Sequence, residues 1–153
     1  MNESQPSLPL VTLVGPPNSG KTTLLNYLSG KNYKTVNYPG STVEYNSTFF
    51  HPKFNIDANL LDSPGIISLI PNSPDEEVTV NSLYEHPRFG VPDLLIATID
   101  SSQLSRHLLL VNQLLLSNFN VIVAITMVDI LDKKGLEICA KDLEVKLGCD
   151  VVK

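Results

Sequence analysis

The apolar residues of this chain fall into short blocks, and the spacing within each block predicts a helix or a strand. Short continuous apolar runs indicate buried strands, and apolar residues three and four positions apart indicate helices with one buried face. The predicted strands are residues 10–14, 43–50, 54–61, 94–99 and 121–127, and a further strand begins at 151–152. The predicted helices are residues 21–29, a helix that begins at Ser73, residues 104–117 and residues 136–147.

Turn-forming residues separate these blocks and predict how they connect. Residues 51–53 join two strands as a hairpin, whereas the polar residues 31–42 and 63–72 are predicted to be long loops. Ser73 is suited to cap a helix because Glu76 stands three residues later. Strands that alternate with helices in this way predict an α/β fold, a mostly parallel sheet with helices on both faces.

Composition agrees with a single folded domain. The 153 residues are 42% hydrophobic, which suits a domain with its own core and excludes a disordered acidic tail. The net charge of -5 argues against a nucleic-acid partner, which needs clustered Lys and Arg. No run approaches the ~20 apolar residues of a membrane span, so a soluble chain is predicted. Residues 1–9 are predicted to be a flexible tail, and Cys139 and Cys149 to be reduced thiols.

The segment GPPNSGKT at residues 15–22 is the strongest chemical signal. It matches GxxxxGK[ST] and lies between a predicted strand and a predicted helix, as a phosphate-binding P-loop does. Backbone N–H groups of such a loop surround the phosphates, Lys21 reaches the β- and γ-phosphates, and the Thr22 hydroxyl ligates Mg²⁺. The predicted nucleotide-binding residues here are Gly15, Pro16, Pro17, Asn18, Ser19, Gly20, Lys21, Thr22 and Thr23. The loop alone does not choose among ATPases, kinases and GTPases.

The sequence Asp62-Ser-Pro-Gly65 follows an apolar strand and fits the DxxG pattern of GTPases. A carboxylate at a strand end can hold Mg²⁺ through water, and the Gly65 N–H can contact the γ-phosphate. The next residue, Ile66, cannot orient a water molecule by hydrogen bonding. We therefore expect hydrolysis to be slow or to use another group or a cation.

The polar loop 31–42 contains the candidate for a switch threonine, the residue that completes the Mg²⁺ shell in a GTPase. Thr42 is the first candidate, but Thr35 and Ser41 lie in the same loop and spacing leaves the choice open.

The segment Thr126-Met127-Val128-Asp129 stands where GTPases carry NKxD, the motif that reads the base. A carboxylate there accepts two hydrogen bonds from guanine that adenine cannot supply, so Asp129 favours guanine. Thr126 replaces the usual Asn and lacks its amide, so we expect a weaker tie between base loop and phosphate loop, and weaker affinity.

Together these segments resemble the N-terminal G domain of the ferrous-iron transport protein B (FeoB) family. The resemblance covers about residues 10–152, so the expected domains are a tail at 1–9 and a G domain at 10–153. The segments that carry it are GPPNSGKTTLLN, NYPGSTVEY, DSPGIISL, SPDEE, LSRHLLLVNQLL and TMVDILDKKGLEI. The resemblance implies the P-loop NTPase fold of small GTPases, with Thr42 as switch threonine and Asn18 as a K⁺-binding residue. The residues it implies for catalysis are Lys21, Asn18, Thr42 and Gly65.

The resemblance further implies a slow GTPase that uses Mg²⁺ and K⁺ and regulates ferrous iron uptake by a membrane transporter. The implied partners are guanine nucleotide and the helical and membrane domains of that transporter, at the cytoplasmic face of the bacterial inner membrane. Self-association through the membrane portion is a further expectation. The chain is expected to stop before the last guanine-binding motif. No residue pattern points to iron, because His51, His86 and His107 are scattered.

Two alternatives remain open from the sequence. A degenerate nucleotide-binding module without turnover is favoured by Thr126 and by the expected loss of the last motif. A cytosolic GTPase of ribosome-assembly type is the other alternative, and the acidic composition weighs against it.

Overall fold

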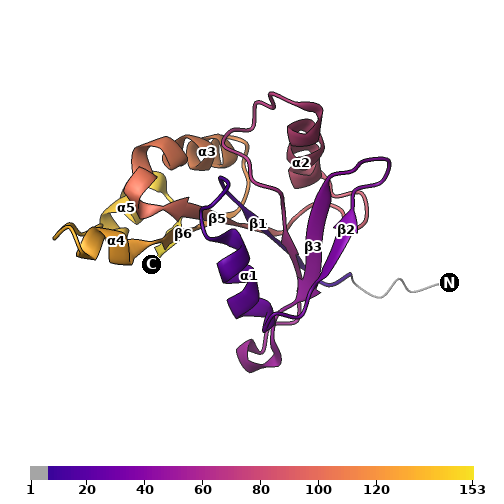
Figure 1. Ribbon diagram of the computed structural model, residues 1–153, viewed down its shortest axis with the longest axis horizontal. Helices are drawn as coiled ribbons and strands as arrows, with labels where there is room; N and C mark the ends of the chain where they lie inside the picture. Colours follow the sequence, from indigo (N-terminus) through magenta and orange to yellow (C-terminus); the bar gives the residue numbers. More distant parts are fainter. Residues whose placement is uncertain (1–6) are drawn as a thin grey trace.

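A seven-stranded sheet forms the centre of the structure, a computed structural model that describes residues 7–153 (Figure 1). The strands are β1 (Leu10–Val14), β2 (Lys34–Asn37), β3 (Glu44–Phe49), β4 (Asn59–Asp62), β5 (Leu94–Asp100), β6 (Val121–Thr126) and β7 (Asp150–Val152). Their order is β2-β3-β4-β1-β5-β6-β7. Pairing is parallel from β4 to β7 and antiparallel from β2 to β4.

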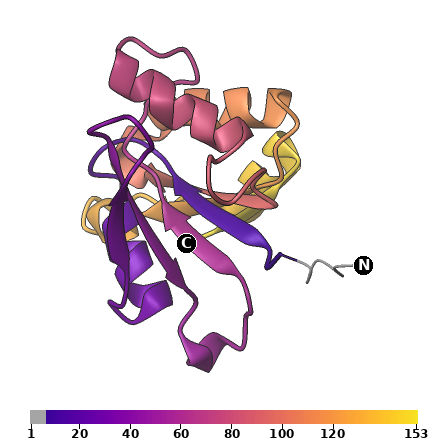
Figure 2. The same cartoon turned by 90° about the vertical axis from the view of Figure 1, so that its right-hand side faces the viewer.

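Helices cover both faces of this sheet. They are α1 (Lys21–Ser29), α2 (Pro74–Tyr84), α3 (Leu104–Leu116), α4 (Val128–Asp132) and α5 (Ala140–Leu147), with short 3₁₀ turns η1 (Pro52–Phe54) and η2 (Ser101–Gln103). Figure 2 shows α1 on one side of the sheet and α2 and α3 on the other. The predicted fold, a mostly parallel sheet with helices on both faces, is therefore confirmed.

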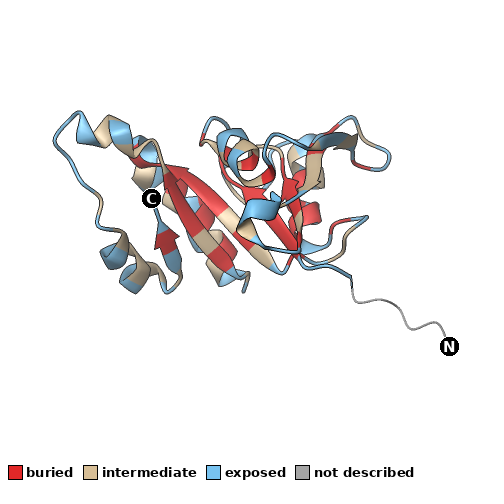
Figure 3. Cartoon of the chain, turned by 90° about the horizontal axis from the view of Figure 1, so that it is seen from below, coloured by how far each residue is buried: buried red, intermediate tan, exposed pale blue. Residues whose placement is uncertain are grey.

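Alternating strand residues build two separate cores, one against each helical layer. Leu13 and Leu60 pack with Leu25 of α1. Val14 and Ile99 belong to the larger cluster, which includes buried residues of α2 and α3 and side chains of α5. Figure 3 shows the buried residues concentrated along the central strands, whose carboxyl ends are thereby held in one row.

The structure corrects three of the predicted segments and adds one helix. The segment 31–42 is not one loop, because β2 forms an edge strand in which Val36 pairs with Tyr45. The strand predicted at 54–61 begins at Asn59, since η1 and the left-handed Asn55 (φ 53°) precede it. The helix predicted at 136–147 begins at Ala140, and α4 is an additional short helix.

The predicted start of α2 is confirmed. The Ser73 side chain accepts a hydrogen bond from the Glu76 N–H at 3.2 Å, and Pro74 occupies the first turn. Of the predicted tail 1–9, residues 1–6 lie outside the described part, and 7–9 contain no helix or strand. Cys139 and Cys149 are free thiols. Within residues 7–153 no helix has the length and apolar character needed to cross a membrane.

A buried aromatic cluster joins the β2–β3 hairpin to the end of α2. Tyr38, Tyr45 and Phe89 surround His86, whose ring centroid lies 4.6 Å from that of Tyr45. His86 is 3% exposed, and its Nε2 has no hydrogen-bond partner. Burial, with a smaller contribution from Arg88, lowers the pKa of His86 to about 4. The folded chain therefore holds this imidazole neutral.

We expect acid to destabilise the fold through His86. Between pH 6.5 and about 4 the unfolded chain binds a proton at this residue and the folded chain does not, so the free energy of unfolding falls as pH drops through this range. Urea midpoints measured across the range should show a smaller slope in His86→Phe, which keeps an aromatic ring. Some slope should remain because burial also lowers the pKa of His107. An unchanged slope in the variant would contradict this assignment.

Candidate nucleotide site

The loop between β1 and α1 lies at the carboxyl edge of the sheet and contains the P-loop sequence. Gly20 and Asn18 adopt left-handed backbone conformations, with φ of 88° and 60°, which turn the loop around on itself. Gly15 must be glycine, because a Cβ there would lie 2.5 Å from the Thr98 carbonyl oxygen. The Ser19 and Thr98 hydroxyls are hydrogen-bonded at 2.6 Å. The loop thus rests directly on the end of β5, a contact that the sequence analysis missed.

Lys21 and Asp62 are two buried residues of opposite charge, and each influences the pKa of the other. The Lys21 Nζ donates to the carbonyls of Gly15 and Pro16, both at 3.2 Å. Burial lowers the pKa of Lys21, and Asp62 opposes that shift. Burial likewise raises the pKa of Asp62, opposed by Lys21 and by a hydrogen bond from Asn46.

One oxygen of Asp62 has no hydrogen-bond partner. Oδ2 accepts from the Asn46 side chain at 3.4 Å, whereas Oδ1 is buried without a hydrogen-bond partner. An unpaired buried carboxylate oxygen is costly unless it meets a donor or a cation. Asn46 was not predicted as a site residue, because a polar residue within a strand gave no signal in the sequence.

The Asp62–Gly65 segment packs tightly onto the P-loop. The Ser63 hydroxyl donates to the Leu13 carbonyl at 2.8 Å, and the Ile66 N–H donates to the Gly15 carbonyl at 3.0 Å. A Cβ on Gly65 would lie 2.8 Å from the backbone N of Pro17. The Ile66 side chain is 1% exposed and belongs to the core rather than to the site.

The base loop is also tied to the P-loop, through Thr126. Its hydroxyl lies 2.8 Å from the Ser19 carbonyl oxygen and 3.1 Å from that of Ile99. Thr126 therefore ties the two loops through its single hydroxyl, and the weaker affinity expected from the missing amide stays a prediction. Asp129 follows in α4, is exposed, and lies 3.7 Å from the Lys133 Nζ.

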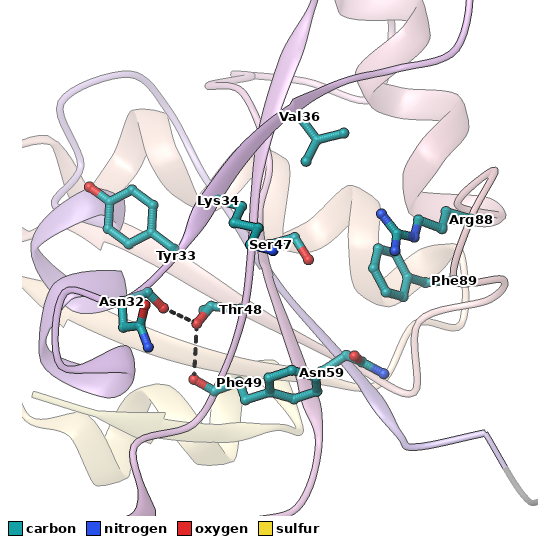
Figure 4. A pocket seen from close by; sticks show the side chains of 10 residues that line it. All are labelled: Asn32, Tyr33, Lys34, Val36, Ser47, Thr48, Phe49, Asn59, Arg88 and Phe89. Atoms are coloured by element: carbon teal, nitrogen blue, oxygen red, sulfur yellow. Dashed lines mark hydrogen bonds between the residues drawn. The ribbon is translucent and has the colours of Figure 1, made fainter.

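A hollow of about 330 Å³ opens between these segments. Its lining residues are Asn18, Gly20, Lys21, Thr22, Thr23 and Met127. A second hollow, of about 350 Å³, lies beside β2 and β3, where Arg88 and Phe89 lie on the same side as Val36 (Figure 4). It contains none of the predicted site residues.

Thr42 is not among the residues that line the hollow at the P-loop, although its neighbour Val43 lines a smaller hollow together with Gly65. It is exposed in the loop between β2 and β3, which projects beyond β3 and away from α1 (Figure 1). This loop is closed by its own hydrogen bond from the Tyr38 N–H to the Val43 carbonyl at 2.9 Å. The Tyr38 hydroxyl contacts the Ser82 hydroxyl at 3.0 Å on α2. Thr35, the alternative, donates to the Asn46 side chain at 2.7 Å.

The donor set fits Mg²⁺ rather than an ion held wholly by protein. No group of three or more His, Cys, Asp or Glu residues could hold a metal within residues 7–153. Mg²⁺ is commonly bound by one or two protein oxygens together with phosphates and water. The Thr22 hydroxyl and the unpaired oxygen of Asp62 match that pattern.

Comparison with known proteins agrees with the motifs. The family model "Ferrous iron transport protein B" matches residues 10–153. The chain belongs to the FeoB family. It is 37% identical to the Fe(2+) transporter FeoB of Escherichia coli K12 over 142 residues, and 38% identical to that of Salmonella typhimurium LT2. The match covers 93% of this chain but 18% of each transporter, so the chain spans under a fifth of these relatives.

Solved FeoB structures share the fold. The S. thermophilus NFeoB bound to GDP.AlF4- and K+ is 38% identical with a TM-score of 0.79, and the match covers 95% of this chain and 54% of that one. A mutant of the same protein bound to GDP gives a TM-score of 0.84 at 34% identity, covering 95% and 55%. The cytosolic domain of L. pneumophila FeoB gives 0.81 at 37% identity, covering 93% and 60%. The predicted P-loop NTPase fold is confirmed.

Gly65→Ala should destabilise this FeoB-family domain by about 1–3 kcal/mol, because the added methyl meets the backbone of Pro17. It should also shift the amide NMR signals of the P-loop, since one of the two segments must move. Urea denaturation and amide spectra measure the two effects. Gly40→Ala is the control: nothing lies within 4 Å of its Cβ, so only its backbone conformation (φ 71°) is strained. P-loop signals that move equally in both variants would refute the proposed contact.

Proposed function

We propose that this FeoB-family domain binds guanine nucleotide in the hollow at the P-loop and hydrolyses GTP slowly. The observation that carries the proposal is the P-loop together with two buried charged residues that influence each other's pKa, Lys21 and Asp62. A buried cation and a carboxylate with an unpaired oxygen suit a phosphate together with a divalent metal. Lys21 lines the hollow at the P-loop together with Asn18, Gly20 and Thr22.

The phosphates would lie against the backbone N–H groups of residues 15–22, with the Lys21 ammonium as their charged partner. Mg²⁺ would be held by the Thr22 hydroxyl and Asp62, and when bound it neutralises phosphate charge. Thr42 would have to approach from the β2–β3 loop to join them. The Gly65 N–H would contact the γ-phosphate, so the β2–β3 loop and the segment 63–72 would respond to its presence.

The base would be read by Asp129. Its exposed carboxylate can accept hydrogen bonds from both the N1–H and the 2-amino group of guanine, an arrangement that discriminates against adenine. Met127 lines the same hollow as the P-loop, and the Thr126 hydroxyl positions the base loop against Ser19. These contacts support guanine as the preferred base.

Hydrolysis would depend on K⁺ at Asn18. Ile66 lies in the core and offers no group that could orient water, so charge stabilisation must come from elsewhere. Asn18 is exposed at the tip of the P-loop and lines the hollow. The similarity to S. thermophilus NFeoB bound to GDP.AlF4- and K+ supports the use of K⁺ by this domain.

In the cell this domain would regulate ferrous iron uptake as the cytoplasmic part of a bacterial membrane transporter. The support is family membership together with relatives named Fe(2+) transporters. Its partners would be the helical and membrane portions of such a transporter, with self-association through the membrane portion. The family match disfavours a GTPase of ribosome assembly. The separation of Thr42 from the P-loop favours one second candidate, a module that binds nucleotide without turnover.

Single-turnover GTP hydrolysis measured in KCl and in NaCl distinguishes a GTPase from a module that binds nucleotide without turnover. K⁺ should accelerate hydrolysis, and Asn18→Ala should abolish the acceleration while GDP affinity in NaCl stays within about threefold. Hydrolysis that is absent in both salts would overturn the GTPase proposal and leave the binding module.

Asp129→Asn should weaken GDP binding at least roughly tenfold, because one hydrogen bond to a charged acceptor contributes about 1.5–3 kcal/mol. Binding of XDP should improve, since the amide can donate to the 2-oxo group of xanthine. Calorimetric titration measures both affinities. Asp132→Asn, an exposed carboxylate of the same helix, should change neither. Equal losses in the two variants would exclude Asp129 as the base reader.

A further inference from the structure

The turn that carries Asp129 is only partly packed, with Val128 against the main core cluster. It comprises residues 127–130, and α4 has no buried residue. Met127 begins the turn in the left-handed conformation, with φ of 56° and ψ of 29°. This conformation is unfavourable for a residue with a Cβ, so something must stabilise it.

The side chain of Ser101, the first residue after β5, provides that stabilisation. The Ser101 hydroxyl donates to the Met127 carbonyl at 2.8 Å, and the Ile130 N–H donates to the same oxygen at 3.0 Å. The Met127 carbonyl oxygen thus has one partner within the turn, the Ile130 N–H, and one outside it, the Ser101 hydroxyl. Ser101 is 5% exposed, which shields its bond from water.

Sheet register explains how residues so distant in sequence meet. Asp100 of β5 pairs with Thr126 of β6 at the end of the parallel ladder. Ser101 and Met127 are the next residue on each strand, so the hydroxyl bond continues the ladder by one step. Two hydroxyls therefore hold the start of the base loop. The Thr126 hydroxyl ties it to Ser19 of the P-loop, and the Ser101 hydroxyl ties the Met127 carbonyl to the end of β5.

Ser101 is itself firmly placed. The preceding carboxylate, Asp100 Oδ1, accepts from the Ser102 N–H at 2.8 Å and from the Ser102 hydroxyl at 2.7 Å. The Asp100 N–H donates to the Nδ1 of His107 at 3.0 Å. These bonds fix η2 at its first residue, so the hydroxyl is preorganised toward Met127.

We propose that Ser101 is a positioning residue for base recognition, holding the turn that presents Asp129 to the guanine 2-amino and N1–H groups. This inference rests on the proposed function. Without the hydroxyl, the Met127 carbonyl loses one partner and the turn gains freedom, so Asp129 must be ordered when the nucleotide binds. The phosphate contacts, which come from the P-loop, are unaffected.

The test compares GDP with IDP, whose base lacks the 2-amino group. Ser101→Ala should weaken GDP binding roughly fivefold to tenfold, as expected for one lost hydrogen bond, and should reduce the ratio of the two affinities. A general loosening of the fold would weaken both ligands equally. Ser105→Ala is the control, because Ser105 is an exposed serine of α3 that is not part of this hydrogen-bonded arrangement. It should leave the affinity ratio unchanged.

Replacing Met127 by glycine provides a second variant. Met127→Gly removes the cost of the left-handed conformation, so it should restore part of the GDP/IDP ratio in the Ser101→Ala background. An unchanged ratio in Ser101→Ala, with wild type preferring GDP, would overturn the role of Ser101 alone. Wild type that binds no GDP, or that binds ADP as tightly, would instead overturn the proposed function.

Hydrogen exchange on the nucleotide-free wild type provides a readout that does not depend on any variant folding. The Ile130 amide should be protected, because it donates to the carbonyl that Ser101 holds. Exchange as fast as that of an open loop would refute a preformed turn, and with it the role of Ser101.

Discussion

The phosphate loop depends on one constraint, the contact of its backbone with the ends of three neighbouring strands. The carbonyls of the loop are the acceptors in these contacts. The Gly15 carbonyl accepts hydrogen bonds from the Ile66 N–H and the Lys21 ammonium, and the Ser19 carbonyl accepts one from the Thr126 hydroxyl. Such bonds contribute only about 1 kcal/mol each, but they are buried and share partners, so they act together. Glycine at position 15 is what allows the approach. A larger residue would separate the loop from β5 and loosen every segment tied to it.

This arrangement divides the candidate site into a fixed part and a movable part. The segments beginning at Asp62 and at Thr126 are hydrogen-bonded to the phosphate loop, or packed on it, in the present structure. The loop that carries Thr42 is instead anchored elsewhere, through the contact of Tyr38 with Ser82 on α2. The two segments expected to respond to a γ-phosphate lie side by side elsewhere, since Val43 and Glu44 line one hollow with Pro64 and Gly65. A nucleotide that attracts Thr42 would have to compete with these contacts.

Sequence patterns predicted the regular elements well wherever local chemistry was strong. The cap at Ser73 and the apolar faces of α1 and α3 are signals that lie within the sequence of each helix. These helices therefore begin and end at or near their expected positions. The errors fell on segments whose structure depends on a partner. β2 is polar and becomes a strand only by pairing with β3, and α4 is too short to show a period. Thr42 was assigned to the site by resemblance, but the position of its loop depends on contacts with α2.

The sequence by itself determined the phosphate loop, the Asp62 and Asp129 motifs and the family, because each is a local pattern of residue types with a specific chemical use. Only the tertiary structure decided how these motifs are connected. The unpaired oxygen of Asp62, the tie from Thr126 to Ser19 and the bond from Ser101 to Met127 involve atoms brought together by strand register. Thr126 shows the difference most clearly. Its residue type predicted the loss of an amide contact, whereas its position in the fold lets its hydroxyl reach the Ser19 carbonyl. Hydrogen bonds depend on where a donor lies, and for residues far apart in the chain only the fold determines that.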